Sequence, residues 1–222
     1  MKSRIKIDSA LAATAVLLTI FLFLNKKLFL NSPVAEGVLS VAGFILIIKG
    51  SLLRMAARGH KRAHSAQSGE LVTSGPYQLI RNPMYLGTFF IGSGFVIMLW
   101  PIWFYPVFVA IFFLRFMKQV RFEEVFLSKQ FGKAYEDYMK ATPRFFPKWS
   151  LLPTKMSKGV FSWNEAFSTK EHRTLWLCLS GAVVCEIVQE KIVFNVFDPL
   201  GVTLTAAIVL SAILIATKVF YK

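Results

Sequence analysis

Apolar runs of membrane-spanning length alternate with polar, basic segments along this chain. Apolar stretches near 20 residues long can cross the hydrocarbon core of a bilayer as helices. The predicted spans are Ala10–Leu30, Val34–Leu53, Met84–Trp100, Pro101–Met117, Leu175–Phe197 and Leu200–Val219. The pattern therefore predicts an all-α, polytopic membrane protein with about six transmembrane helices, forming a single integral membrane domain over residues 1–222.

The third and fourth runs adjoin at Trp100-Pro101 without a charge between them. Each is about 17 residues long, which is close to the lower limit for crossing a bilayer. A tight helical hairpin is therefore expected. The fifth run is the weakest of the six, because Glu186, Glu190 and Lys191 interrupt it.

Charge placement predicts an orientation. The chain is 55% hydrophobic yet carries a formal net charge of +14, and all but four of its 26 Lys and Arg residues fall near the two ends, within 54–81 or within 115–173. Six spans put these segments on one side, which the positive-inside rule makes cytoplasmic. Both termini are thus expected in the cytoplasm, at a bacterial inner membrane or a eukaryotic internal membrane. The basic excess suits anionic lipid headgroups, so membrane lipids and no nucleic acid are the expected partners.

No small-residue cleavage site follows the first run, and an uncleaved first span is expected in place of a signal peptide. The oligomeric state stays open. His60, His64 and His172 lack metal-ligand spacing with one another and are expected to be solvated loop residues. No metal site is predicted.

A second kind of periodicity follows the hairpin. Apolar residues recur there at spacings of three and four, as on one face of an amphipathic helix. The face comprises Val120, Glu124, Leu127, Phe131, Tyr135 and Tyr138. The pattern predicts a cytoplasmic amphipathic helix, and Gly132 is expected to break or kink it.

Glu124 is the one charge on that apolar face. An unpaired carboxylate is costly in such a place, so it should have a partner. That partner is either a basic residue, Arg81, Arg115 or Arg121, or the hydroxyls or ammonium of a ligand. Its neighbour Glu123 is rotated away and is expected to be solvated.

Arg81 stands before Asn82-Pro83, at the start of the third run. Proline suits the first turn of a helix, which makes Asn82 the expected N-cap, with its side-chain oxygen meeting a free backbone N–H. Arg81 is then either an interfacial anchor for the helix or a forked donor for a carboxylate, helped by the positive helix end.

Tyrosines accompany these charges. They could offer aromatic faces to an adenine ring or a sulfonium cation, or simply anchor the protein at the membrane interface. They are Tyr77, Tyr85, Tyr135 and Tyr138. Gly87, Gly92 and Gly94 in the third run favour close helix packing.

Two motifs lie on either side of the hairpin. They read Gly75-Pro76-Tyr77…Arg81-Asn82-Pro83-Met84-Tyr85-Leu86-Gly87 and Glu123-Glu124…Phe131-Gly132…Tyr135…Tyr138…Pro143-Arg144-Phe145-Phe146-Pro147. Together they resemble the isoprenylcysteine carboxyl methyltransferase family and the related membrane phospholipid methyltransferases. The resemblance covers a catalytic core of about 70–148, and 174–222, with two predicted spans, is a C-terminal extension.

The resemblance implies an all-helical membrane enzyme that uses S-adenosylmethionine. Its cofactor would lie at the cytoplasmic face, and its lipophilic substrate would enter from the bilayer. Carried over residue by residue, the implied cofactor-binding residues are Tyr77, Arg81, Asn82, Pro83, Tyr85, Glu123, Glu124, Tyr135 and Tyr138. Arg81 and Glu124 are the implied catalytic residues. The family usually has His where Asn82 stands; Asn cannot titrate, which argues against proton transfer there.

The expected function is therefore methyl transfer to a lipophilic acceptor, with carboxyl O-methylation favoured. N- or S-methylation of a lipid or small molecule is the closest alternative. A sterol-type membrane reductase and a small non-enzymatic transporter are more distant ones. The charge-free stretch 84–113 argues against the transporter, whose spans should carry polar residues facing one another.

Overall fold

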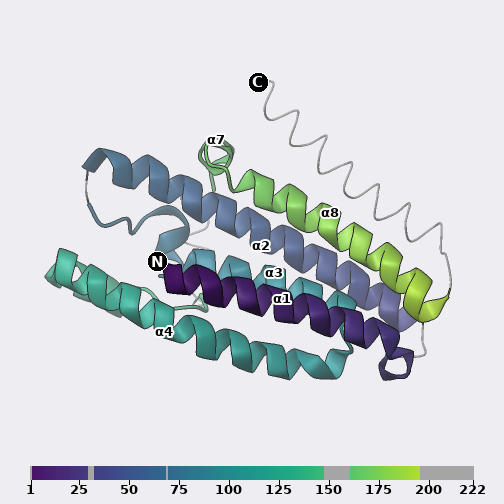
Figure 1. Ribbon diagram of the computed structural model, residues 1–222. Helices are drawn as coiled ribbons and strands as arrows, with labels where there is room; N and C mark the ends of the chain where they lie inside the picture. Colours follow the sequence, from purple (N-terminus) through teal and green to yellow (C-terminus); the bar gives the residue numbers. More distant parts are fainter. Residues whose placement is uncertain (1, 30–32, 69, 148–160, 196–222) are drawn as a thin grey trace.

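The computed structural model describes residues 2–29, 33–68, 70–147 and 161–195. Every regular element within these residues is helical, as the apolar runs predicted. The long helices are α1 (Lys2–Leu24), α2 (Pro33–Ser68), α3 (Pro83–Leu99), α4 (Tyr105–Phe131) and α8 (His172–Gln189). They run alongside one another, with α2 between α8 and α3 (Figure 1). Shorter elements are η1 (Lys26–Leu28), η2 (Gly75–Gln78), η3 (Ile102–Phe104), α5 (Lys133–Ala141), α7 (Trp163–Phe167) and η5 (Glu190–Phe194).

Two of the described helical stretches, Ala35–Ser65 and Ile102–Phe131, are long and apolar enough to cross a membrane. Two shorter apolar stretches, Ser9–Leu24 and Pro83–Leu99, accompany them. This agrees with a membrane protein. The count of six spans, the membrane hairpin and the orientation stay predictions, and the span 200–219 lies outside the described residues.

The outward faces of these helices are also apolar. Leu17 on α1 is 67% exposed and Leu114 on α4 is 72% exposed. Further exposed apolar residues on α1 are Leu11, Val16, Ile20, Phe21 and Leu24. So many exposed large apolar side chains on neighbouring helices are unusual for a protein surrounded by water. Contact with lipid tails would explain it.

Helix α2 is longer than its apolar run. The predicted span ends at Leu53 and the histidines after it are expected in a loop, but the helix continues to Ser68. A fall in hydropathy marks the end of an apolar run but not the end of a helix. This segment is rich in Ala and Arg, and it also contains Lys; all three residue types favour a helix. The prediction of solvated loop histidines is wrong for the same reason: His60 and His64 lie in α2, and His60 is buried.

Helix α4 combines two predicted elements, the second arm of the hairpin and the first half of the amphipathic helix. It ends at Phe131 because Gly132 adopts a φ of +52°, which glycine tolerates better than other residues. The predicted break at Gly132 is confirmed. α5 starts immediately afterwards, which turns Tyr135 and Tyr138 back toward the other helices.

The weak fifth run is α-helical only as far as Gln189, and Glu186 lies within that helix. Helix α8 passes into the π-helical turn η5, which contains Glu190 and Lys191 and ends at Asn195 in the left-handed conformation. Such π turns are uncommon departures from α-helical geometry. His172 begins α8 and is half-buried, not part of a solvated loop.

Glycines bring α2 and α3 into backbone contact. A Cβ placed on Gly50 would lie 2.5 Å from the carbonyl oxygen of Gly87, and one on Gly94 would lie 2.5 Å from that of Gly43. The close packing predicted for Gly87 and Gly94 is confirmed. The contact also sets Arg54, one turn after Gly50, against α3 at the edge of the functional site.

Gly50→Ala should therefore lower the free energy of unfolding by about 1–3 kcal/mol, because the added methyl overlaps backbone that cannot move independently. Gly37→Ala is the matched control on the same helix, since a Cβ there has nothing within 4 Å. Thermal unfolding of both variants in detergent measures the difference. Equal midpoints for the two variants would show that the glycine contact is not needed.

Candidate functional site

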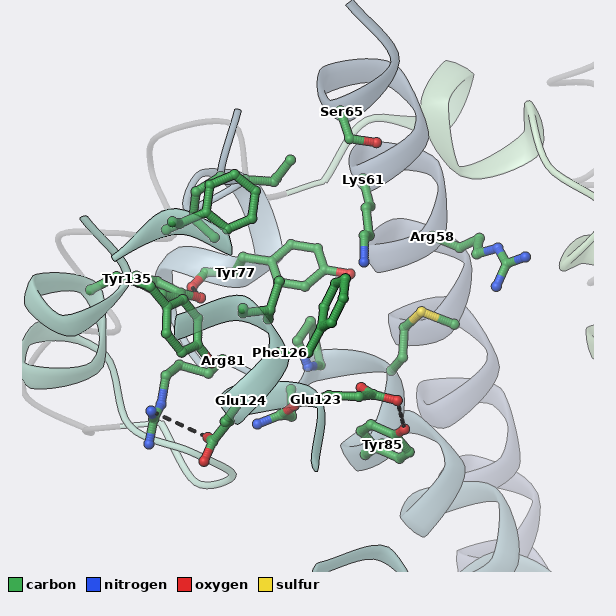
Figure 2. A pocket seen from close by; sticks show the side chains of 18 of the residues that line it. Arg58, Lys61, Ser65, Tyr77, Arg81, Tyr85, Glu123, Glu124, Phe126 and Tyr135 are labelled. Carbon is green, nitrogen blue, oxygen red and sulfur yellow. Dashed lines mark hydrogen bonds and ion pairs between the residues drawn. The ribbon is translucent and has the colours of Figure 1, made fainter. Parts of the chain in front are cut away.

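A cavity of about 720 Å³ opens where α2, α3, α4 and α5 meet (Figure 2). Its size falls within the usual range for small-molecule sites, about 300–1,000 Å³. All nine residues predicted to bind a cofactor line it: Tyr77, Arg81, Asn82, Pro83, Tyr85, Glu123, Glu124, Tyr135 and Tyr138. The fold thus brings the two sequence motifs into one site.

The closing motif joins the first motif through the backbone at the start of α3. The Arg81 N–H donates to the carbonyl oxygen of Pro143 at 2.8 Å, and Asn82 Nδ2 donates to that of Arg144 at 3.2 Å. Asn82 is the N-cap residue and Pro83 opens the helix, as predicted. The predicted side-chain cap is wrong, because the Asn82 side chain contacts the closing segment and makes no capping bond.

Glu124 is buried and held by two arginines. Arg144 contacts it as a fork, with Nε 3.1 Å from Oε1 and Nη2 2.6 Å from Oε2. Arg81 Nη1 lies 3.2 Å from Oε1. The predicted need for a partner is confirmed; Arg81 was one of the named candidates and Arg144 was not. A carboxylate held this way is positioned firmly and has little capacity left for a ligand.

The guanidinium of Arg81 is not fully satisfied. Its side chain is only 10% exposed, and within the described residues Nε and Nη1 have no hydrogen-bond partner. The contact with Glu124 therefore provides charge compensation without hydrogen-bond geometry. Buried donors of this kind are costly to leave unpaired. Arg81 is accordingly the best-placed donor in the cavity for an incoming carboxylate.

Glu123 faces the cavity as well, so the prediction that it is solvated is wrong. It accepts a hydrogen bond from Tyr85 Oη at 2.5 Å (Figure 2). It accepts a second one from Gln119 Nε2 at 2.9 Å. Helical rotation does separate the two glutamates, as expected. The cavity is wide enough to reach both, with Glu124 turned toward the closing segment and Glu123 toward α3.

The tyrosines form neutral walls. Tyr138 Oη donates to the carbonyl oxygen of Tyr77 at 2.6 Å, and Tyr135 is 2% exposed. Burial is the main cause that raises the pKa of all three phenols above the usual value, and the nearby Glu123 raises the pKa of Tyr77 further. These side chains therefore offer aromatic faces and neutral hydroxyls, not phenolate bases.

Basic residues on α2 complete the cavity, and the sequence analysis did not select them. They are Arg54, Arg58 and Lys61. Arg54 donates from Nη1 to Thr88 Oγ1 at 2.6 Å and pairs through Nη2 with Glu171 at 3.0 Å. Lys61 extends from α2 toward Tyr77 (Figure 2). The sequence did contain a signal for them: they are separated by four and then three residues, which places all three on one face of a helix.

Comparisons with known proteins find mainly methyltransferases. Residues 34–134 match the family model described as phospholipid methyltransferase. The protein-S-isoprenylcysteine O-methyltransferase of Rattus norvegicus is 37% identical over 119 residues, 49% of this chain and 41% of that protein. The B form from Arabidopsis thaliana is 27% identical over 143 residues, 61% and 73% of the two chains. The nickel-cobalt-cadmium resistance protein of Alcaligenes xylosoxydans xylosoxydans is 36% identical over 86 residues, which are 39% of this chain and 40% of that protein.

No solved structure matches the chain. The first curated relatives it matches are covered over 40% to 56% of their own length. The helical fold, the two motifs and the shared cavity agree with a similarity to membrane methyltransferases. Residues 34–134, slightly less than half of the chain, are similar to the phospholipid methyltransferase family, and about half of the chain is similar to protein-S-isoprenylcysteine O-methyltransferases.

Proposed function

We propose that this protein transfers a methyl group from S-adenosylmethionine to a lipophilic acceptor at the cytoplasmic face of a membrane. The observation that carries the proposal is the cavity itself, in which the buried, incompletely paired Arg81 and the carboxylate of Glu123 lie among tyrosine rings. Similarity to methyltransferases favours a methyltransferase over the sterol-type reductase and the transporter. A multi-pass arrangement with cytoplasmic termini is part of the proposal.

The lining suits the parts of S-adenosylmethionine. Arg81 would take the methionine carboxylate through a charge-assisted hydrogen bond. Glu123 would accept from the ammonium or the ribose hydroxyls. Tyr77, Tyr135 and Tyr138 would pack on the adenine or face the sulfonium, which favours an aromatic surface. When bound, the cofactor supplies an activated methyl group.

Glu124 has a different role in this proposal from the one the family resemblance implied. Its carboxylate is occupied by Arg144 and Arg81, so it acts as a positioning residue that holds Arg81 in place. Arg144 takes part by attaching the closing segment to α4. Glu123, which was expected to matter less, becomes the acidic group that contacts ligand.

A carboxylate is the methyl acceptor that needs the least catalytic assistance from the residues of this cavity. It is already deprotonated at neutral pH, so the chain has only to exclude water and align it with the methyl group. The basic residues Arg58 and Lys61 would draw such an anion to the opening on the α2 side. An amine acceptor would first have to lose a proton, and the neutral tyrosines do not supply a base. Several relatives carry the name isoprenylcysteine O-methyltransferase, which agrees with this choice.

The acceptor is tested by incubating the solubilised protein with radiolabelled S-adenosylmethionine and a panel of acceptors. The panel comprises an isoprenylated cysteine with a free carboxyl group, phosphatidylethanolamine, and water-soluble thiols and amines. The expected result is label on the isoprenylated carboxylate that mild base releases, as a methyl ester requires. Base-stable label on the phospholipid would instead support N-methylation. Label confined to water-soluble acceptors would contradict the lipophilic substrate.

A further inference from the structure

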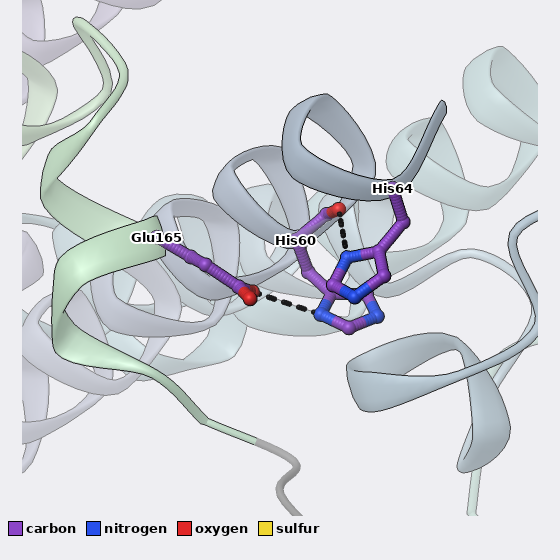
Figure 3. A group of neighbouring side chains, drawn as sticks. All are labelled: His60, His64 and Glu165. Carbon is purple, nitrogen blue, oxygen red and sulfur yellow. Dashed lines mark hydrogen bonds and ion pairs between the residues drawn. The ribbon is translucent and has the colours of Figure 1, made fainter. Parts of the chain in front are cut away.

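A cluster of two histidines and a glutamate lies beside Ser74 and Gly75, at the start of the turn that carries Tyr77. His60 and His64 come from α2 and Glu165 from α7 (Figure 3). One ligand atom from each residue lies within 4.8 Å of the other two. The two imidazole rings stack, with centroids 3.9 Å apart.

As loop residues the histidines showed no metal-ligand spacing, but this expectation changes because α2 makes His60 and His64 an i, i+4 pair; with Glu165, their residue types and spacing are those of a metal site. Positions i and i+4 lie on one helical face, so His60 and His64 present their rings to the same space. Two histidines at this spacing plus a carboxylate from another segment form a ligand set that binds zinc in proteins, with one position left for water. Imidazole also suits cobalt and nickel.

The hydrogen bond that His64 makes through Nδ1 leaves the lone pair of its ring on Nε2, the atom that could bind a metal. Nδ1 lies 3.0 Å from the backbone carbonyl oxygen of His60. A carbonyl can only accept, so Nδ1 carries the hydrogen and the neutral ring has its lone pair on Nε2. Metal-ligating histidines are oriented in this way, by donation from the other ring nitrogen to a carbonyl or carboxylate.

His60 has a partner that allows the same arrangement. Nδ1 lies 2.9 Å from Glu165 Oε2 and Nε2 lies 2.8 Å from Ser74 Oγ. A serine hydroxyl can donate or accept, so the ring proton can sit on Nε2 and leave the lone pair of Nδ1 directed to Glu165. The ring itself is buried against Gly75, where a Cβ would lie 2.7 Å from its atoms.

We propose that His60 Nδ1, His64 Nε2 and the Glu165 carboxylate bind one divalent transition-metal ion, such as Zn²⁺ or Co²⁺. The ion replaces the hydrogen bond between His60 and Glu165, and the proton of His60 moves to Nε2 and is donated to Ser74. His60 is fixed by its packing. The Glu165 side chain, 27% exposed, and the exposed His64 adjust to metal bonds of about 2.0–2.2 Å.

Such an ion would connect the cavity wall to the chain after the closing motif. Ser74 precedes the turn that carries Tyr77, and α7 precedes α8. Arg62 Nη1 already donates to the carbonyl oxygen of Ser168 at 2.8 Å, beside the same cluster. The expected role of the ion is therefore to fasten α7 to α2. The inference does not depend on the proposed methyl transfer.

Titration of the full-length, detergent-solubilised protein with Co²⁺ tests the proposal, using a purification tag without histidines. Calorimetry should give one ion per chain with a micromolar or lower Kd, accompanied by a visible absorption band of bound Co²⁺ that Zn²⁺ abolishes. His64→Ala and Glu165→Gln should each raise the Kd at least tenfold.

His172→Ala is the matched control, because His172 also has Nδ1 near a backbone carbonyl, 2.7 Å from that of Thr169, but lies outside the cluster. It should bind Co²⁺ as the wild type does. His64 is exposed, so its replacement leaves the fold intact, and the thermal midpoint of His64→Ala without metal checks this. Failure of the wild type to bind Co²⁺ at 100 µM, or equal Kd values for His64→Ala and His172→Ala, would overturn the proposal.

Discussion

Glu124→Ala is expected to lower the free energy of unfolding by about 3–5 kcal/mol, the usual cost of removing one partner from a buried ion pair. The substitution leaves the guanidinium of Arg81, 10% exposed, without charge compensation. It also removes the fork through which Arg144 attaches the closing segment to α4. Chemical denaturation in detergent, followed by tryptophan fluorescence, measures the change.

Asp137→Ala is the matched control for this loss. Asp137 pairs with Lys140 on α5 at 3.6 Å, but both side chains are more than half exposed. Exposed pairs contribute about 0–1 kcal/mol, so the control should stay within roughly 0.5 kcal/mol of the wild type. Similar losses in the two variants would show that the Glu124 cluster is no more important than a surface pair.

Arg81→Ala is expected to lower kcat/KM for S-adenosylmethionine about ten- to a hundredfold. The estimate follows from the loss of one charge-assisted hydrogen bond, roughly 1.5–3 kcal/mol. Arg81→Lys should recover only part of this loss, because an ammonium cannot reproduce the fork of a guanidinium. Steady-state methyl transfer at varied cofactor concentration measures the effect.

Arg62→Ala serves as the comparison for Arg81→Ala. Arg62 is an exposed arginine on α2 that lies outside the cavity and contacts Ser168. Its removal should leave kcat/KM within about twofold, because surface substitutions are usually small in effect. If Arg81→Ala retained the efficiency of Arg62→Ala, the assignment of Arg81 to the cofactor would fail.

Local signals in the sequence predicted much of the fold. Apolar length marked the long helices, Pro83 marked the start of α3, and Gly132 marked the break before α5. Gly87 and Gly94 marked the face that packs on α2. Each of these depends on a residue's own backbone or on its nearest neighbours. The extent of α2 beyond Leu53 was missed because polarity changes there while helix propensity does not.

The sequence predicted which residues line the site, but not the contacts that each of them makes. The motifs named the residues that line the cavity, yet helical rotation alone could not show which side of α4 the cavity occupies. The roles expected for Glu123 and Glu124 therefore changed once the cavity was placed. Arg144 was missed as the partner of Glu124 because it lies beyond α5, where only the folded backbone brings it near.

The central claim is that this cavity binds S-adenosylmethionine through Arg81 and Glu123, and calorimetric titration of the solubilised full-length protein tests it most directly. One molecule should bind per wild-type chain. Glu123→Gln should weaken binding by about tenfold or more, through the loss of a charged acceptor, while unfolding at the wild-type midpoint. Absence of binding to the folded wild type, or an unchanged Kd in Glu123→Gln and in Arg81→Ala, would contradict the account.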